Sequence, residues 1–116
     1  MRDTVELQYI VEQDTEIKHV DFEVVENPKD PNHLERKQQQ RGIHDVQILI
    51  ALNYGIKKRT FQNLSYTITD RCLIGTVYYN YIDKLRGLTI IGDWEGDCFH
   101  IITSFWNFSI KNRKRF

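Results

Sequence analysis

The chain has few of the features that assign a function directly. It has 116 residues, only two cysteines, two prolines and one methionine, and its formal net charge is zero. No apolar run approaches the ~18 residues of a membrane span, and the acidic N-terminal segment does not fit a secretory signal. We therefore expect no membrane partner and a cytoplasmic location, in which Cys72 and Cys98 are reduced.

Sequence motifs for cofactors and metals are missing as well. The six glycines form neither a GxGxxG pattern nor a P-loop, and no HxxxH or HExxH spacing occurs among the four histidines. The two cysteines share no metal-ligand spacing, and the carboxylates cluster in no ligand pattern along the chain. The sequence therefore predicts no cofactor and no metal site.

The zero net charge conceals a strong division along the chain. Residues 1–30 contain nine Asp/Glu against three Lys/Arg, a local charge of about −6, and residues 31–116 contain thirteen Lys/Arg against seven Asp/Glu, about +6. A basic body of this kind can bind polyanions while an acidic segment packs on it. Solvated faces and a loose basic tail are the other interpretation.

Alternating apolar and polar residues dominate residues 4–26. Val5 to Val11 and Ile17 to Val25 both alternate, with Asp14 between them, which predicts an acidic N-terminal β-hairpin with one wet face. We assign residues 1–30 to this extension.

Two helices should follow the hairpin. Asp30 and Gly42 are suited to the start and end of a polar helix over residues 31–41, which contains Leu34 as its one apolar side chain. An apolar stripe that includes Val46 and Ile50 predicts a core helix over residues 44–54, ended by Gly55. A corner at residues 42–43 would make the two helices a hairpin.

The rest of the chain has the composition of strands. We expect strands over residues 59–62, 64–69, 73–81, 88–92 and 98–106, with a turn at residues 93–97. The predicted fold is α+β: a two-helix hairpin packed on a curved antiparallel sheet, preceded by the β-hairpin. We expect one domain over residues 1–116, with a core at 31–107 and a basic tail at 108–116.

The order and spacing of several motifs resemble a known bacterial family. The motif His33-x3-Lys37-x3-Arg41-Gly42-Ile43, followed by residues 51–55, is similar to the two-helix opening of "domain of unknown function 4258". Strands like residues 85–91 and 100–103 typically follow, so the resemblance covers about residues 33–107. That family is distantly similar to toxins of the RelE and BrnT type, small α+β proteins that cut or block RNA on ribosomes.

The resemblance implies an RNA-directed, toxin-like domain controlled by a protein antitoxin. If the protein is an enzyme, it would be a metal-independent ribonuclease that needs acid/base groups and cations. Catalytic candidates are His33, Arg59 and Tyr66. The candidates for nucleic-acid binding lie on the polar helix and are Arg36, Lys37 and Arg41.

A non-catalytic role is the alternative. Lys37 stands where the family usually has arginine, and the segment 74–82 looks like an insertion. Lys37, the neutral net charge and the weak set of catalytic candidates favour a structural or protein-interaction module, which could be a homodimer.

Overall fold

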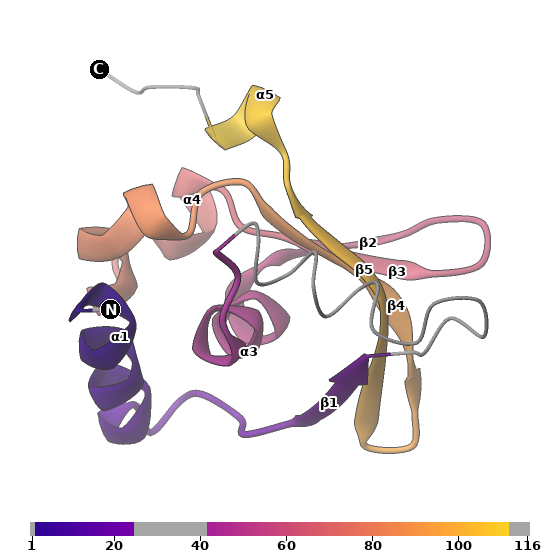
Figure 1. The fold of residues 1–116 in the computed structure, drawn as a ribbon, viewed down its shortest axis with the longest axis horizontal. Helices are drawn as coiled ribbons and strands as arrows, with labels where there is room; N and C mark the ends of the chain where they lie inside the picture. The colour runs from indigo at the N-terminus through magenta and orange to yellow at the C-terminus, as the bar shows by residue number, and fades with distance from the viewer. Residues whose placement is uncertain (1, 25–41, 112–116) are drawn as a thin grey trace.

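A five-stranded sheet organises the part of the chain that the computed structural model describes, residues 2–24 and 42–111 (Figure 1). Its strands, in the spatial order β1-β5-β4-β3-β2, are β1 (Asp21–Val24), β5 (Cys98–Trp106), β4 (Leu88–Glu95), β3 (Leu64–Thr67) and β2 (Ile56–Arg59). Neighbours pair antiparallel except β1, which lies parallel to β5 at one edge. The fold is α+β with a mixed, mostly antiparallel sheet.

Helices cover one face of the sheet in two layers (Figure 1). α3 (Asp45–Tyr54) packs against β3 and β4, and α1 (Arg2–Gln13) packs on the side of α3 away from the sheet. The other described helices are α4 (Asp70–Leu73), the 3-10 helix η1 (Val77–Lys84) and α5 (Phe108–Lys111). Ile50, Ile90 and Phe99 are fully buried in the core between α3 and the sheet.

The expected N-terminal β-hairpin over residues 4–26 is wrong. Residues 2–13 form α1, and the short strand β1 pairs with β5 instead of with the residues before it. Val5 and Tyr9 belong to the alternating pattern but are 66% and 65% exposed, whereas Leu7 and Val11, one helical turn apart, are buried. The spacing of Leu7 and Val11 fits a helix and a strand alike. Packing of the helical stripe on the rest of the fold therefore decides in favour of the helix.

The connection from α1 to β1 is held on α3 by the side-chain amide of Asn53. The backbone N–H of Lys18 donates to Oδ1 of Asn53, and Nδ2 of Asn53 donates to the carbonyl oxygen of Lys18, both at 2.8 Å. One amide thus satisfies two backbone groups that no strand pairs. This anchor fixes where β1 joins the sheet.

Most of the elements expected from residue 44 onward are confirmed. The helix over residues 44–54 is α3, which ends where the backbone N–H of Gly55 donates to the carbonyl of Ala51. The strands expected over residues 64–69, 88–92 and 98–106 are β3, β4 and β5, and Gly96 forms the β4–β5 turn with φ +63°. The strand expected over 59–62 lies earlier, as β2. The helix expected over 31–41 lies outside the described residues.

The strand expected over residues 73–81 is wrong. Thr69 caps α4, its Oγ1 accepting a hydrogen bond from the backbone N–H of Cys72 at 3.4 Å. Gly75 then has φ +90°, a conformation that residues with a side chain resist, so the apolar run cannot continue as a strand. η1 follows and buries Tyr78 completely. Leu73 is also buried, whereas Ile74, Val77 and Tyr79 are exposed, so the strand-like composition of this segment does not mark a strand.

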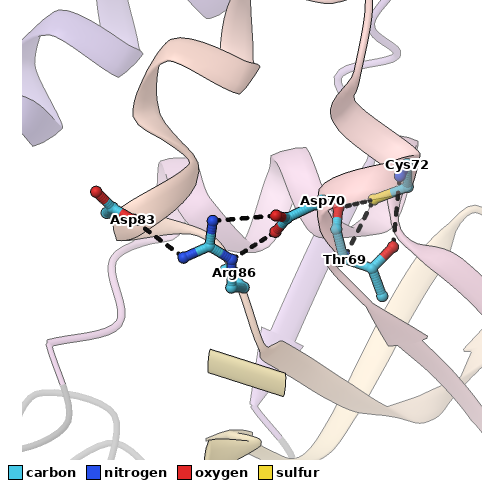
Figure 2. A network of polar contacts seen from close by, with 5 residues as sticks. All are labelled: Thr69, Asp70, Cys72, Asp83 and Arg86. Carbon is cyan, nitrogen blue, oxygen red and sulfur yellow. Dashed lines mark hydrogen bonds and ion pairs between the residues drawn. The ribbon is translucent and has the colours of Figure 1, made fainter. Parts of the chain in front are cut away.

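A buried ion pair joins the helical segment between β3 and β4 to the chain just before β4 (Figure 2). Nε and Nη2 of Arg86, just before β4, donate to the two carboxylate oxygens of Asp70 in α4, and Nη1 donates to Asp83 at 3.0 Å. Asp70 and Arg86 are 6% and 12% exposed, whereas Asp83 is 87% exposed. Hydrogen bonding to Asp70 raises the pKa of Arg86, so the guanidinium stays charged.

Arg86→Ala should destabilise the protein by about 3–5 kcal/mol, because it leaves the buried carboxylate of Asp70 without a partner. Arg86→Lys should cost less, since it keeps the charge but not the two-pronged contact. Urea denaturation measures both. Arg71→Ala is the matched control on α4, where the side chain is exposed, and it should change stability by less than about 0.5 kcal/mol. Equal losses of stability in Arg71→Ala and Arg86→Ala would contradict the assignment of Asp70 and Arg86 as a stabilising ion pair.

Candidate nucleic-acid interface

The β2–β3 hairpin presents a cationic surface without acidic residues. No aspartate or glutamate occurs in the sequence between Asp45 and Asp70, and the three cations of that stretch, Lys57, Lys58 and Arg59, all lie on β2. All four β2 side chains are exposed. No neighbouring carboxylate in this stretch neutralises the positive charge.

β3 anchors this hairpin to the core, and β2 forms the edge of the sheet. Lys57 lies opposite Tyr66 and Arg59 opposite Leu64, and both β3 partners are buried. The backbone N–H and the hydroxyl of Thr60 donate to the carbonyl of Asn63, at 2.8 and 3.0 Å, which closes the turn. The cations therefore project from a rigid support.

An exposed aromatic ring sits at the tip of the hairpin. Phe61 is 96% exposed, more than any other large hydrophobic residue that the structure describes. Exposed aromatics next to cations are the side chains on which single-stranded nucleic acids stack their bases while the cations contact phosphates. We refer to Lys57, Lys58, Arg59 and Phe61 together as the hairpin surface.

The structure places only two of the residues predicted from sequence. His33, Arg36, Lys37 and Arg41 lie outside the described residues. Arg59 belongs to the hairpin surface. Tyr66 is 6% exposed, its hydroxyl accepts a hydrogen bond from Nε1 of Trp94 at 3.0 Å, and its ring packs edge-on against Phe99.

Arg59 and Tyr66 lie at diagonal positions of β2 and β3, but only the arginine is accessible. The Tyr66 side chain is 6% exposed and its hydroxyl is paired with an indole, so little of it is accessible in this structure. The catalytic assignment of Tyr66 stays a prediction, and its observed role is core packing.

Sequence reasoning overlooked most of the hairpin surface. It used Arg59 but not Lys57, Lys58 or Phe61. The signal that could have found them is the run of 24 residues, 46–69, that lacks any Asp or Glu and ends in a strand, a turn and a second strand. The exposure of Phe61 could not be read from the sequence, because phenylalanine is more often buried.

A separate cavity of about 510 Å³ lies between α1, the end of α3 and the start of η1. At its wall the hydroxyls of Tyr54 and Tyr78 both donate to Oδ2 of Asp14, at 2.7 and 2.9 Å. The centroids of the two tyrosine rings are 5.3 Å apart. This contact joins three helices through one carboxylate.

The shared carboxylate shifts the pKa values of all three groups. Burial would raise the pKa of Asp14, but hydrogen bonds from Tyr54, Tyr78 and two backbone groups together lower it. Burial first, and then the hydrogen bond to Asp14, raise the pKa of Tyr54 from 10.0 to about 12, and the same causes raise that of Tyr78. These shifts mark a structural contact, since the tyrosines stay neutral and Asp14 charged near neutral pH.

Comparisons with protein-family models, curated proteins and solved structures found no match for this chain. The resemblance noted in the sequence therefore stays a prediction. Within the described residues, no helix is both long and apolar enough to cross a membrane.

Alkaline pH should test the Asp14 contact. A raised tyrosine pKa contributes stability that is fully present below pH 10 and is lost between pH 10 and about 12. The urea midpoint of the wild-type protein should fall across this range, and Tyr54→Phe should make the fall shallower, because the ionisable group is gone. Tyr9→Phe, at a 65% exposed position, is the control and should leave the fall unchanged. Identical profiles for Tyr54→Phe and the wild type would refute the contact.

Proposed function

We propose that this protein is an RNA-contacting module of the toxin-like class that its sequence resembles, and that it binds RNA through the hairpin surface. The observation that carries the proposal is the combination of three exposed cations on β2 and an exposed phenylalanine at the tip, in a stretch without acidic residues. Cations bind phosphates whatever the base sequence, and an aromatic ring accepts any base. Single-stranded RNA fits this chemistry best.

The rigid support favours binding as well. Leu64 and Tyr66 fix β3 in the core, so the β2 backbone that carries the cations is held in place before any ligand arrives. A preorganised backbone loses little conformational entropy on binding. The polar helix with Arg36, Lys37 and Arg41 remains a second predicted phosphate contact, and cleavage through His33, Arg59 and Tyr66 remains a prediction.

A protein partner is the second candidate, favoured by the position of β2. Among the described strands it lies at the edge of the sheet, so one row of its backbone groups pairs with no described strand and can pair with a strand of another chain. Two β2 strands would bring their lysines and arginines together, which is unfavourable. The edge therefore fits an acidic partner segment, such as an antitoxin would supply, better than a second copy of this chain.

The first test removes two of the cations. Lys57→Gln combined with Arg59→Gln should weaken binding to a fluorescent single-stranded RNA about tenfold at physiological salt, and should flatten the salt slope by up to ~1.4, because each phosphate contact contributes about 0.7. Fluorescence anisotropy over a salt series measures both quantities. The matched control, Lys18→Gln with Arg71→Gln, removes the same charge from other exposed positions and should change the slope little.

Two results would count against the proposal. Equal losses in the hairpin variant and the control would mean that only net charge matters. If the wild-type protein does not bind RNA even at low salt, RNA binding is ruled out and only the protein partner stays as a candidate.

The second test removes the aromatic ring. Phe61→Ala should leave the melting temperature unchanged, since the ring is 96% exposed, but should cost about 1–3 kcal/mol in RNA binding through lost stacking. Tyr9→Ala, an exposed aromatic on α1, is the control for general surface effects. Full binding by Phe61→Ala would show that the ring has no part in the interface.

A further inference from the structure

A mixed cluster of metal-ligand side chains lies on the sheet face opposite the described helices α1 and α3. Phe99 and Ile101 of β5 point into the core, so Cys98 and His100, which alternate with them, point to the other face. The parallel pairing of β1 places Glu23 beside His100, and the antiparallel pairing of β4 places Glu95 beside Cys98. Three strands thus bring sulfur, nitrogen and oxygen donors to one place.

One donor atom from each of three residues lies within a few ångströms of the others. One ligand atom each from Glu23, Cys98 and His100 lie within 4.8 Å of one another, the one such group among the described residues. Nε2 of His100 is 3.1 Å from Oε1 of Glu23. Zinc bonds of about 2.0–2.1 Å at tetrahedral angles hold nitrogen and oxygen ligands about 3.3 Å apart, so His100 and Glu23 need little rearrangement and the sulfur of Cys98 has to move closer.

The imidazole of His100 has a carboxylate at each nitrogen. Nδ1 is 3.2 Å from Oε2 of Glu95, while Nε2 faces Glu23. A neutral imidazole has one N–H, so it can donate to one carboxylate, and its other nitrogen then presents a lone pair to the second. A second proton on the imidazole, or a metal ion, would remove the repulsion between this lone pair and the carboxylate. Only a metal ion would also use the sulfur of Cys98.

We propose that Glu23, Cys98 and His100 form a binding site for a zinc-class divalent transition-metal ion, with Glu95 positioning His100. Nε2 binds the ion, and Nδ1–H donates to Glu95, the arrangement by which a carboxylate fixes the orientation of a metal-binding histidine. The thiolate favours zinc over magnesium or calcium, which prefer oxygen donors. Three protein ligands leave a fourth position for water or another ligand.

The surrounding charge favours a cation. Asp21, Asp93 and Asp97 are exposed near the two glutamates, on β1, on β4 and in the β4–β5 turn. The site lies at the acidic edge of the sheet, with β4 and β3 between it and the cationic β2. It is therefore independent of the proposed RNA surface, and either proposal can fail alone.

Cobalt binding to the reduced full-length chain tests the site. Co²⁺ should bind saturably, one ion per chain, with a thiolate charge-transfer band and the visible bands of a tetrahedral complex, and Zn²⁺ should displace it. Cys98→Ser should abolish the charge-transfer band, and His100→Gln should weaken binding at least tenfold. Glu95→Gln should keep the band but weaken binding about 10–100-fold, as expected of a positioning residue.

Cys72→Ser is the matched control. Cys72 lies in α4, where its Sγ contacts the carbonyl oxygen of Thr69 at 3.1 Å, and its removal should leave all bands intact. If Cys98→Ser does not fold, as judged by circular dichroism, Zn²⁺ protection of Cys98 from alkylation in the wild-type protein, read by mass spectrometry, gives the same answer. No saturable cobalt band in the wild type, equal spectra for the two cysteine variants, or alkylation of Cys98 unaffected by zinc would overturn the proposal.

Discussion

The buried contact between Asp70 and Arg86 is the constraint on which the C-terminal half of the fold depends. The chain leaves the sheet after β3, forms two short helices around a left-handed glycine, and must return to β4, its central strand. Short helices have little stability of their own. A charged, two-pronged contact between Asp70 in the first of them and Arg86, two residues before β4, supplies a fixed point for the return (Figure 2).

Elsewhere in the molecule, too, single polar side chains hold short elements and connecting segments in place. Asn53 binds the backbone before β1, and Asp14 binds the hydroxyls of two tyrosines from α3 and η1. Gln47 of α3 accepts from the backbone N–H of His44 and donates to the carbonyl of Lys84. α3 is thus the hub for these contacts, which explains how a small core organises so many short elements.

The sequence predicted the α+β class, α3 and the central strands because their apolar patterns extend over several residues and end at glycines or turns. It failed at residues 4–26 and 73–81 for two physical reasons. Leu7 and Val11 satisfy helical and strand periodicity alike, and Gly75 interrupts a run whose composition is typical of a strand. The metal-ligand cluster could not be predicted, since it depends on the parallel pairing of β1 with β5. The sequence contains only the alternation of Cys98 and His100 with the apolar Phe99 and Ile101.

The pairing of β1 with β5 has a consequence for the order in which the molecule assembles. β4 and β5 are joined by a tight turn, so they can pair early, whereas Asp21 must find Cys98 across most of the chain. Closing so long a loop costs chain entropy that only later contacts recover, and such pairings form late. Glu23 reaches His100 only after that step. An ion held between Glu23 and His100 would bind only the fully folded protein. Its binding energy would therefore stabilise the β1–β5 pairing, the contact that forms last and opens first.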